Sequence, residues 1–148
     1  MAMKRYLKKL FEPPNQKITL ILLIAGILLL VAGSIIGIAD NPPGLVVMFV
    51  GIILLLFAFI HLWRKSKPYL ILMLISFLGG IIFAILHNLF DALAIHWSEL
   101  TLIPQILEGL AVGSFLIAVL LCPVGIFVGF LGAILTYFLK RNPKRTAE

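Results

Sequence analysis

The chain alternates long apolar stretches with short polar segments. Four stretches contain no Asp, Glu, Lys or Arg: residues 18–39, 45–63, 68–90 and 109–139, with lengths of 22, 19, 23 and 31 residues. A helix rises about 1.5 Å per residue, so about 20 residues cross the hydrocarbon core of a bilayer. Because each stretch is apolar on all sides, it lacks the alternation of a membrane β-strand. The pattern predicts an all-α membrane protein in which four transmembrane helices form a bundle.

We expect these helices to belong to a single membrane domain over residues 1–148. The segments beside and between them are residues 1–17, a cytoplasmic interfacial segment, residues 91–108, an outer connection, and residues 140–148, a basic cytoplasmic tail. The arrangement of residues 91–116 stays open among a surface helix, a re-entrant segment and an extension of the third and fourth helices.

The fourth stretch is too long for one straight crossing. Its 31 residues would extend about 46 Å, which is more than ordinary tilt absorbs. Pro123 lies near its middle and has no backbone donor, so the sequence predicts a long fourth helix with a kink at Pro123.

Composition and charge strengthen the membrane prediction and orient the chain. Hydrophobic residues make up 62% and charged residues 12%, whereas a soluble domain carries roughly 25% charged residues. All 12 Lys and Arg residues lie before the first stretch, between the second and third, or after the fourth. The positive-inside rule then predicts that both termini are cytoplasmic, in a prokaryotic plasma membrane. Topology explains the basic charge, so we expect no nucleic-acid partner.

Small residues recur along the stretches, and in lipid such residues let helices approach closely. The candidate packing residues are Gly33, Gly37, Gly79, Gly80, Gly109, Gly113, Gly125, Gly129 and Ala133. They are expected to pack the helices of one bundle. The alternative is that the row Gly125, Gly129 and Ala133 forms an interface with a second copy or with another membrane protein.

Polar side chains with metal-ligating chemistry gather after the third stretch. They are His87, Asp91, His96 and Glu99, and imidazole and carboxylate groups are the ligands that zinc prefers. On one straight helix His96 would point about 180° away from His87, so a metal site requires the chain to fold back. We favour a hydrated helix end in which His87 bonds to Asp91, and the metal site is the alternative. We expect no cofactor, with a divalent metal such as zinc at this segment as the alternative.

The first residues form a different pattern, with apolar and basic residues on opposite faces of a short predicted helix. The membrane-surface candidates are Lys4, Arg5, Leu7, Lys8, Lys9, Leu10 and Phe11, and Pro13 and Pro14 end the segment. Such a helix is expected to lie along the inner leaflet and to attract anionic lipids. The alternative is a disordered basic segment that acts only as a retention signal.

These observations leave three functions open. No charged residue lies deep in a stretch, which disfavours proton-coupled transport, and HExxH, nucleophile-elbow and glycine-rich phosphate motifs are absent. We favour a non-enzymatic accessory, assembly or regulatory subunit that acts through helix–helix contacts. The alternatives are a small oligomeric channel or transporter for an apolar or weakly polar solute, and a metal-dependent membrane enzyme at the outer surface.

Overall fold

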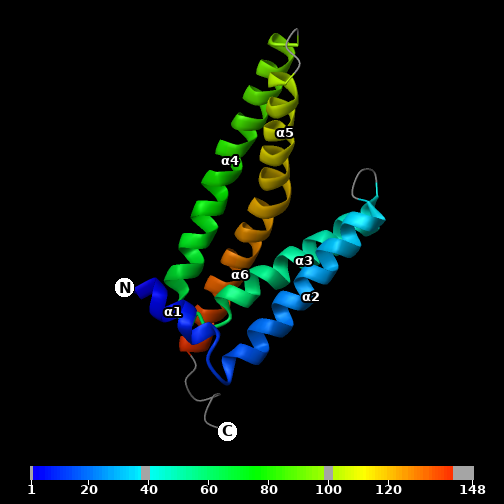
Figure 1. Ribbon diagram of the computed structural model, residues 1–148. Coiled ribbons are helices and arrows are strands. Elements are labelled where there is room, and N and C mark those ends of the chain that lie inside the picture. Colours follow the sequence, from blue (N-terminus) through cyan, green and yellow to red (C-terminus); the bar gives the residue numbers. More distant parts are fainter. Residues whose placement is uncertain (1, 38–40, 99–101, 142–148) are drawn as a thin grey trace. The chain divides into compact units, whose positions relative to one another are not determined.

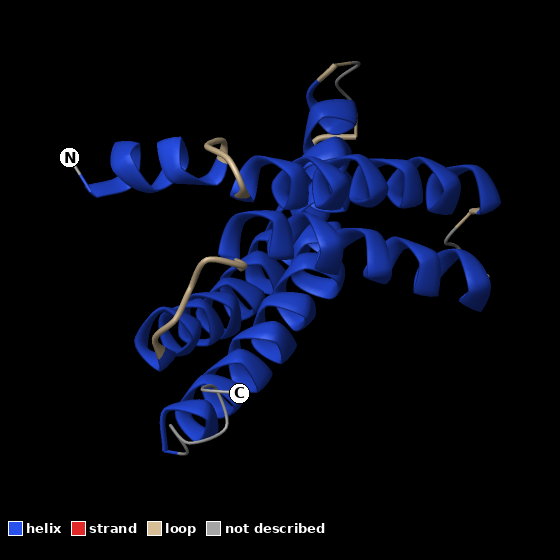
Figure 2. Ribbon diagram, turned by 90° about the horizontal axis from the view of Figure 1, so that it is seen from below, coloured by secondary structure: helices blue, strands red, loops and turns tan. Residues whose placement is uncertain are grey.

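The structure is a computed structural model that describes residues 2–37, 41–98 and 102–141 (Figure 1). Within these ranges the chain is built of helices joined by short loops, with no strand (Figure 2). The helices are α1 (Ala2–Leu10), α2 (Asn15–Ile36), α3 (Pro42–Ile60), α4 (Ser66–His96), α5 (Ile103–Leu116), the π-helical segment η1 (Ile117–Leu121) and α6 (Cys122–Arg141). The predicted all-helical class is confirmed.

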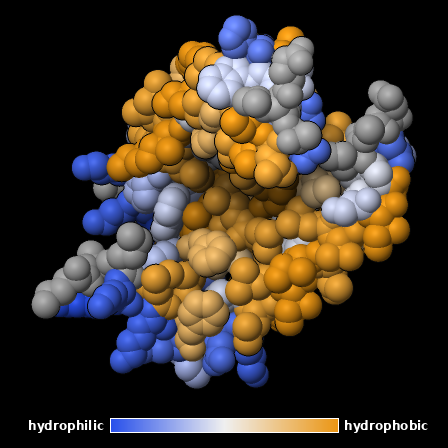
Figure 3. Space-filling model, turned by 45° about the horizontal axis from the view of Figure 1, so that its top comes forward, coloured by the Kyte–Doolittle hydropathy of each residue, from blue (hydrophilic) through white to orange (hydrophobic). Residues whose placement is uncertain are grey.

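Four helical stretches have the length and composition of membrane spans. They are α2, α3, α4 and the continuous run Ile103–Leu139, which passes through η1. Apolar side chains cover most of the face shown in Figure 3, and hydrophilic side chains lie toward its margins. Apolar surface this extensive is rare on soluble monomers. It is the kind of surface that is expected to face lipid.

The chain forms two compact helical units, Met1–Arg64 and Lys65–Glu148. Unit 1 holds α1 and the antiparallel pair of α2 and α3. Unit 2 holds α4, which runs antiparallel to α5, η1 and α6 (Figure 1).

Glycine residues let α2 and α3 approach backbone to backbone in unit 1. A Cβ built on Gly51 would lie 3.1 Å from both the Gly26 oxygen and the Leu30 nitrogen, and one on Gly33 would lie 3.3 Å from the Gly44 oxygen. Gly26 thus faces Gly51, and Gly33 faces Gly44. Each pair of glycines on one helix is seven residues apart, which is close to two turns, so both lie on the same face.

Gly37 ends α2. Its φ of 88° lies in the region that favours glycine, and its N–H donates to the Gly33 oxygen at 3.0 Å. The first turn of α3 comes directly against this end, since a Cβ on Gly44 would collide with the Gly37 oxygen. Pro42 and Pro43 open α3 in the first helical turn, where a missing N–H costs nothing.

The helices of unit 2 extend beyond the apolar stretches that predicted them. Residues 91–96 continue α4, and residues 103–108 already belong to α5, although both segments were expected in the outer connection. Residues 91–96 contain neither Gly nor Pro, so nothing in that sequence interrupts the helix. In the described parts of 91–116, residues 91–96 extend α4, and residues 103–108 extend the helical run of the fourth stretch.

A π-helical segment lies directly before Pro123, where the sequence predicts a kink. In η1 the Cys122 N–H donates to the Ile117 oxygen, five residues back instead of four. In a regular α-helix the ring of Pro123 would clash with the Val119 carbonyl, and a wider turn relieves that clash. The long fourth helix therefore passes the proline without a break in the helical run.

Candidate functional site

The polar end of unit 2 was the main candidate for chemistry. His87 bonds across the helix pair: its Nδ1 lies 3.1 Å from the Ala111 oxygen on α5, and its ring centroid is 5.2 Å from that of Phe115. Asp91 and His96 are exposed. The structure thus gives the His87 ring a partner on α5, whereas the sequence analysis expected Asp91 on its own helix.

No group of three or more His, Cys, Asp or Glu side chains that could hold a metal ion occurs among the described residues. Glu99, the fourth proposed ligand, lies outside them. The metal site at His87, Asp91, His96 and Glu99 therefore stays a hypothesis.

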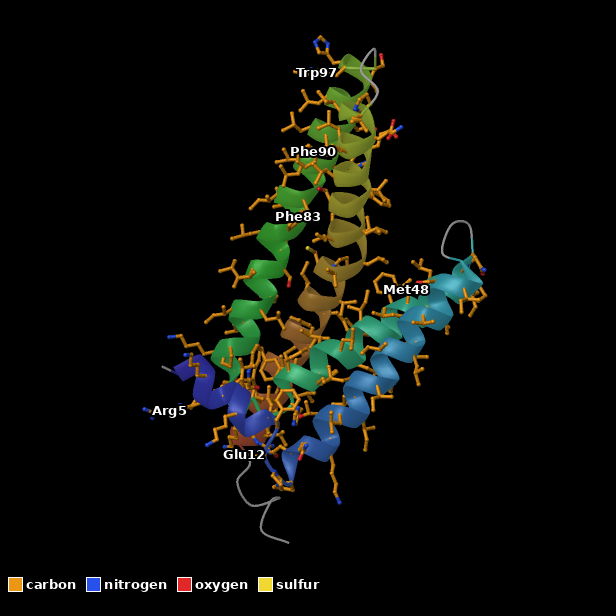
Figure 4. The ribbon with its side chains drawn as sticks, in the orientation of Figure 1. Arg5, Glu12, Met48, Phe83, Phe90 and Trp97 are labelled. Carbon is orange, nitrogen blue, oxygen red and sulfur yellow. The ribbon has the colours of Figure 1, made fainter. Side chains whose placement is uncertain are left out.

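The helix end that carries these residues is apolar as well as polar. Figure 4 places Trp97 just beyond the end of α4, past Phe83 and Phe90. The Trp97 side chain is 44% exposed and the Ile95 side chain 70% exposed. Trp is typical of the zone where a membrane meets water.

In unit 2 the candidate packing residues of α6 lie against α4. A Cβ on Gly129 would lie 2.7 Å from the Met73 nitrogen and 2.8 Å from the Tyr69 oxygen, and one on Gly125 would collide with the Ser76 hydroxyl. Ala133 is buried. The row that the sequence analysis offered as an interface with another chain is therefore occupied, at Gly125 and Gly129, by α4 of the same unit.

The other candidate glycines have looser surroundings. A Cβ on Gly79 or Gly80 would make ordinary contact with Cys122, at 3.6 and 3.4 Å. A Cβ on Gly109 or Gly113, in α5, would have nothing within 4 Å. Among the described residues of unit 2, these two are the helical glycines with open space in front of them.

The sequence analysis missed four glycines that make close contacts. They are Gly26, Gly44, Gly51 and Gly132, and a Cβ on Gly132 would collide with the Tyr69 ring. A signal for them was present: Gly26 and Gly33, Gly44 and Gly51, and Gly125 and Gly132 are each seven residues apart. A search for spacings of four residues overlooks this two-turn repeat.

Hydroxyl groups in the spans bond mostly to their own helices. The Ser34 hydroxyl donates to the Leu30 oxygen at 2.9 Å, and the Thr136 hydroxyl donates to the Gly132 oxygen at 2.7 Å. Thr136 Oγ1 also lies 2.9 Å from the Ser66 hydroxyl on α4. The Ser34 and Thr136 hydroxyls therefore use their single donor within their own helices.

The N-terminal helix α1 is fixed to the other helices of unit 1. The Tyr6 hydroxyl donates to the Phe59 oxygen near the end of α3, and the Thr19 hydroxyl of α2 donates to the Leu10 oxygen at 2.9 Å. Leu10 is fully buried, whereas Leu7 and Phe11 are 43% and 45% exposed. The four cations of α1 are exposed, and Figure 4 shows Arg5 pointing outward.

Comparison with protein-family models, with curated proteins and with solved structures found no match. The class of the protein is therefore inferred from the helices of this chain alone. Four apolar helices of spanning length indicate a small membrane protein.

Proposed function

We propose that this chain is a non-enzymatic protein of the plasma membrane, an accessory, assembly or regulatory subunit that acts by packing α5 against another membrane protein. The observation that carries the proposal is the open space in front of Gly109 and Gly113. A glycine inside a helix costs up to about 1 kcal/mol relative to alanine. In membrane helices such positions are characteristic of close helix–helix contacts. Among the described residues of unit 2, the other helical glycines each face a neighbouring helix, closely at Gly125, Gly129 and Gly132 and at ordinary contact distance at Gly79 and Gly80.

The surroundings of these glycines favour a helix as the partner. Gly109 and Gly113 are one turn apart on α5, and Ile106, one turn earlier, is 62% exposed. A small-residue face flanked by large apolar side chains accepts an apolar helix.

The distribution of charge supports an orientation with both termini in the cytoplasm. In each unit the spanning helices are antiparallel, so the start of the first and the end of the last lie at the same end of the pair. In unit 1 these ends carry Lys17 and Arg64, and in unit 2 they carry Lys67, Lys140 and Arg141. Under the positive-inside rule this end of each pair is cytoplasmic.

The channel alternative has less support, because close glycine contacts leave no space between α2 and α3 or between α4 and α6. Any pathway would then lie outside these helix pairs. Solute flux through liposomes that contain the pure protein would favour a channel over the subunit proposed above.

Photo-crosslinking in native membranes tests the proposal. A photoreactive phenylalanine analogue at Ile106 is expected to give one discrete protein adduct, whereas the same probe at Ile85 on α4 reaches only lipid. The two side chains are equally exposed, at 62% and 63%, so the comparison is matched. The size of the adduct tells a second copy from a different protein.

A substitution on the proposed face completes the test. A Cβ at Gly113 would have nothing within 4 Å, so Gly113→Leu is expected to fill the proposed face, remove the Ile106 adduct and leave the fold intact. Equal protein adducts from Ile106 and Ile85, or none from Ile106, would contradict the proposal.

A further inference from the structure

The outward surface of α1 combines cations with an apolar edge. At about 100° per residue, Lys4, Lys8, Arg5 and Lys9 occupy an arc of about 140° around the helix. Tyr6 and Leu10 point to the opposite side, where Tyr6 bonds to the Phe59 oxygen and Leu10 is buried. That side of α1 is therefore already used within unit 1.

Leu7 and Phe11 lie between the buried side of α1 and its cations. They are one turn apart, and each is nearly half exposed. Lys4 lies three residues before Leu7, and Lys8 lies three residues before Phe11, so both lysines border this apolar edge. Arg5 and Lys9 lie farther round the helix, away from it.

We propose that the edge formed by Lys4, Leu7, Lys8 and Phe11 binds an anionic phospholipid of the inner leaflet. The acyl chain lies along Leu7 and Phe11, and the phosphate lies against the two ammonium groups. An amphipathic helix at a membrane surface places its apolar side chains at the headgroup–acyl boundary, and its lysines reach the headgroups from there.

Two features of unit 1 make this edge a defined binding place. First, α1 is held by three bonds: that of Tyr6 to Phe59, that of Thr19 to Leu10, and that of the Asn15 amide to the Lys9 oxygen at 3.2 Å. Second, Figure 1 shows α1 lying across the end of the α2 and α3 pair instead of continuing α2. A helix across the end of two membrane spans lies in the plane of the interface.

Among the described residues of unit 1, Glu12 is the one carboxylate. It lies 3.7 Å from the Lys8 ammonium, and both side chains are largely exposed. An exposed pair of this kind is weak, so a lipid phosphate competes with it effectively. The inference does not depend on whether α5 has a partner.

The test uses the full chain in nanodiscs of phosphatidylcholine that contain a minor share of phosphatidylglycerol. After mild extraction, native mass spectrometry counts the lipids that each protein molecule retains. The wild-type chain is expected to retain phosphatidylglycerol preferentially. The double variant Lys4→Gln, Lys8→Gln should lower this retention about twenty-fold, because each cation near a lipid surface contributes roughly a fivefold attraction. The matched variant Arg5→Gln, Lys9→Gln removes the same charge from the same helix and should lower it less than about threefold.

Two further measurements do not require the loss of a lysine. Glu12→Gln frees Lys8 and should increase retention of phosphatidylglycerol, and salt near 1 M should remove the preference of the wild type because it screens charges beyond about 3 Å. Equal losses in the two double variants, or no preference for phosphatidylglycerol in the wild type, would overturn the proposal. So would displacement of the lipid by the soluble headgroup alone, since that result leaves no part for Leu7 and Phe11.

Discussion

Glycine has opposite roles at Gly129 and Gly113, although both lie in the same helical run. At Gly129 the nearest atoms to an added methyl group would be the backbone of Met73 and Tyr69, which cannot move aside as a flexible side chain can. At Gly113 an added Cβ would have no described atom of unit 2 within 4 Å, apart from the backbone of its own helix. The effect of a side chain at each position is therefore decided by the neighbouring helix and not by helix propensity.

A pair of alanine substitutions tests this difference. Gly129→Ala should destabilise unit 2 by about 1–3 kcal/mol, the usual cost of overpacking. Gly113→Ala should be neutral or stabilising by up to about 1 kcal/mol, because alanine is the better helix former. Thermal unfolding of both variants in the same detergent measures the difference, and equal melting temperatures would contradict the contact at Gly129.

At the scale of the helices, the sequence predicted their number and approximate extent but not how they pair. Helix formation depends on long apolar runs, which are visible residue by residue. Pairing depends on which faces meet, and for α2 and α3 that follows from Gly26 and Gly51, which were not singled out. The ends at His96 and Ile103 were also missed, because a polar residue such as Asp91 was taken to end a helix that it can continue.

The sequence predicts a kink at Pro123, and the structure has the π-helical segment η1 directly before it. That segment was not predicted, since the proline shows only that one hydrogen bond is lost. For the outer polar residues, the sequence listed the right groups without their partners. The Ala111 oxygen that binds His87 is a backbone atom on another helix, so the pattern of side chains in the sequence does not predict this contact.

The register between α4 and α6 can be tested by shifting it. Ser66→Cys with Thr136→Cys, in a Cys122→Ala background, should form a disulfide on mild oxidation, because the two hydroxyl oxygens lie 2.9 Å apart. One alanine inserted after Phe127 should abolish this cross-link, since it turns the rest of α6 by about 100°. The control is one alanine inserted after Ser98, in the connection between α4 and α5, which should leave the cross-link intact. Cross-linking that survives both insertions would show that the register is not fixed as described.

At the scale of the whole molecule, the position of the charges relative to the helix ends defines an expected topology. In each antiparallel pair, basic residues flank the end where the first helix begins and the last helix ends. Asp91 lies near the opposite end of α4. Within one pair the orientation of one helix determines that of the other, so few probes are needed.

Cysteine labelling in intact cells tests this topology. In a Cys122→Ala background, Asp91→Cys should react with a membrane-impermeant maleimide before lysis, whereas Lys17→Cys and Lys67→Cys should react only after it. Labelling of all three after lysis is the control for reactivity. A reaction of Lys17→Cys or Lys67→Cys in intact cells would reverse the proposed orientation, and a reporter fused after Arg145 checks the C-terminal end independently.

The spanning helices of the two units differ in length. With 22 and 19 residues, α2 and α3 extend about 33 and 28 Å, whereas the 31 residues of α4 extend about 46 Å. A bilayer whose hydrocarbon core is about 30 Å thick matches the lengths of α2 and α3. The longer α4 must therefore tilt strongly or extend beyond the headgroups. A thicker membrane, such as one rich in sterol, would reduce the length mismatch of α4 and increase that of α2 and α3. The lipids that best match unit 1 therefore do not match unit 2.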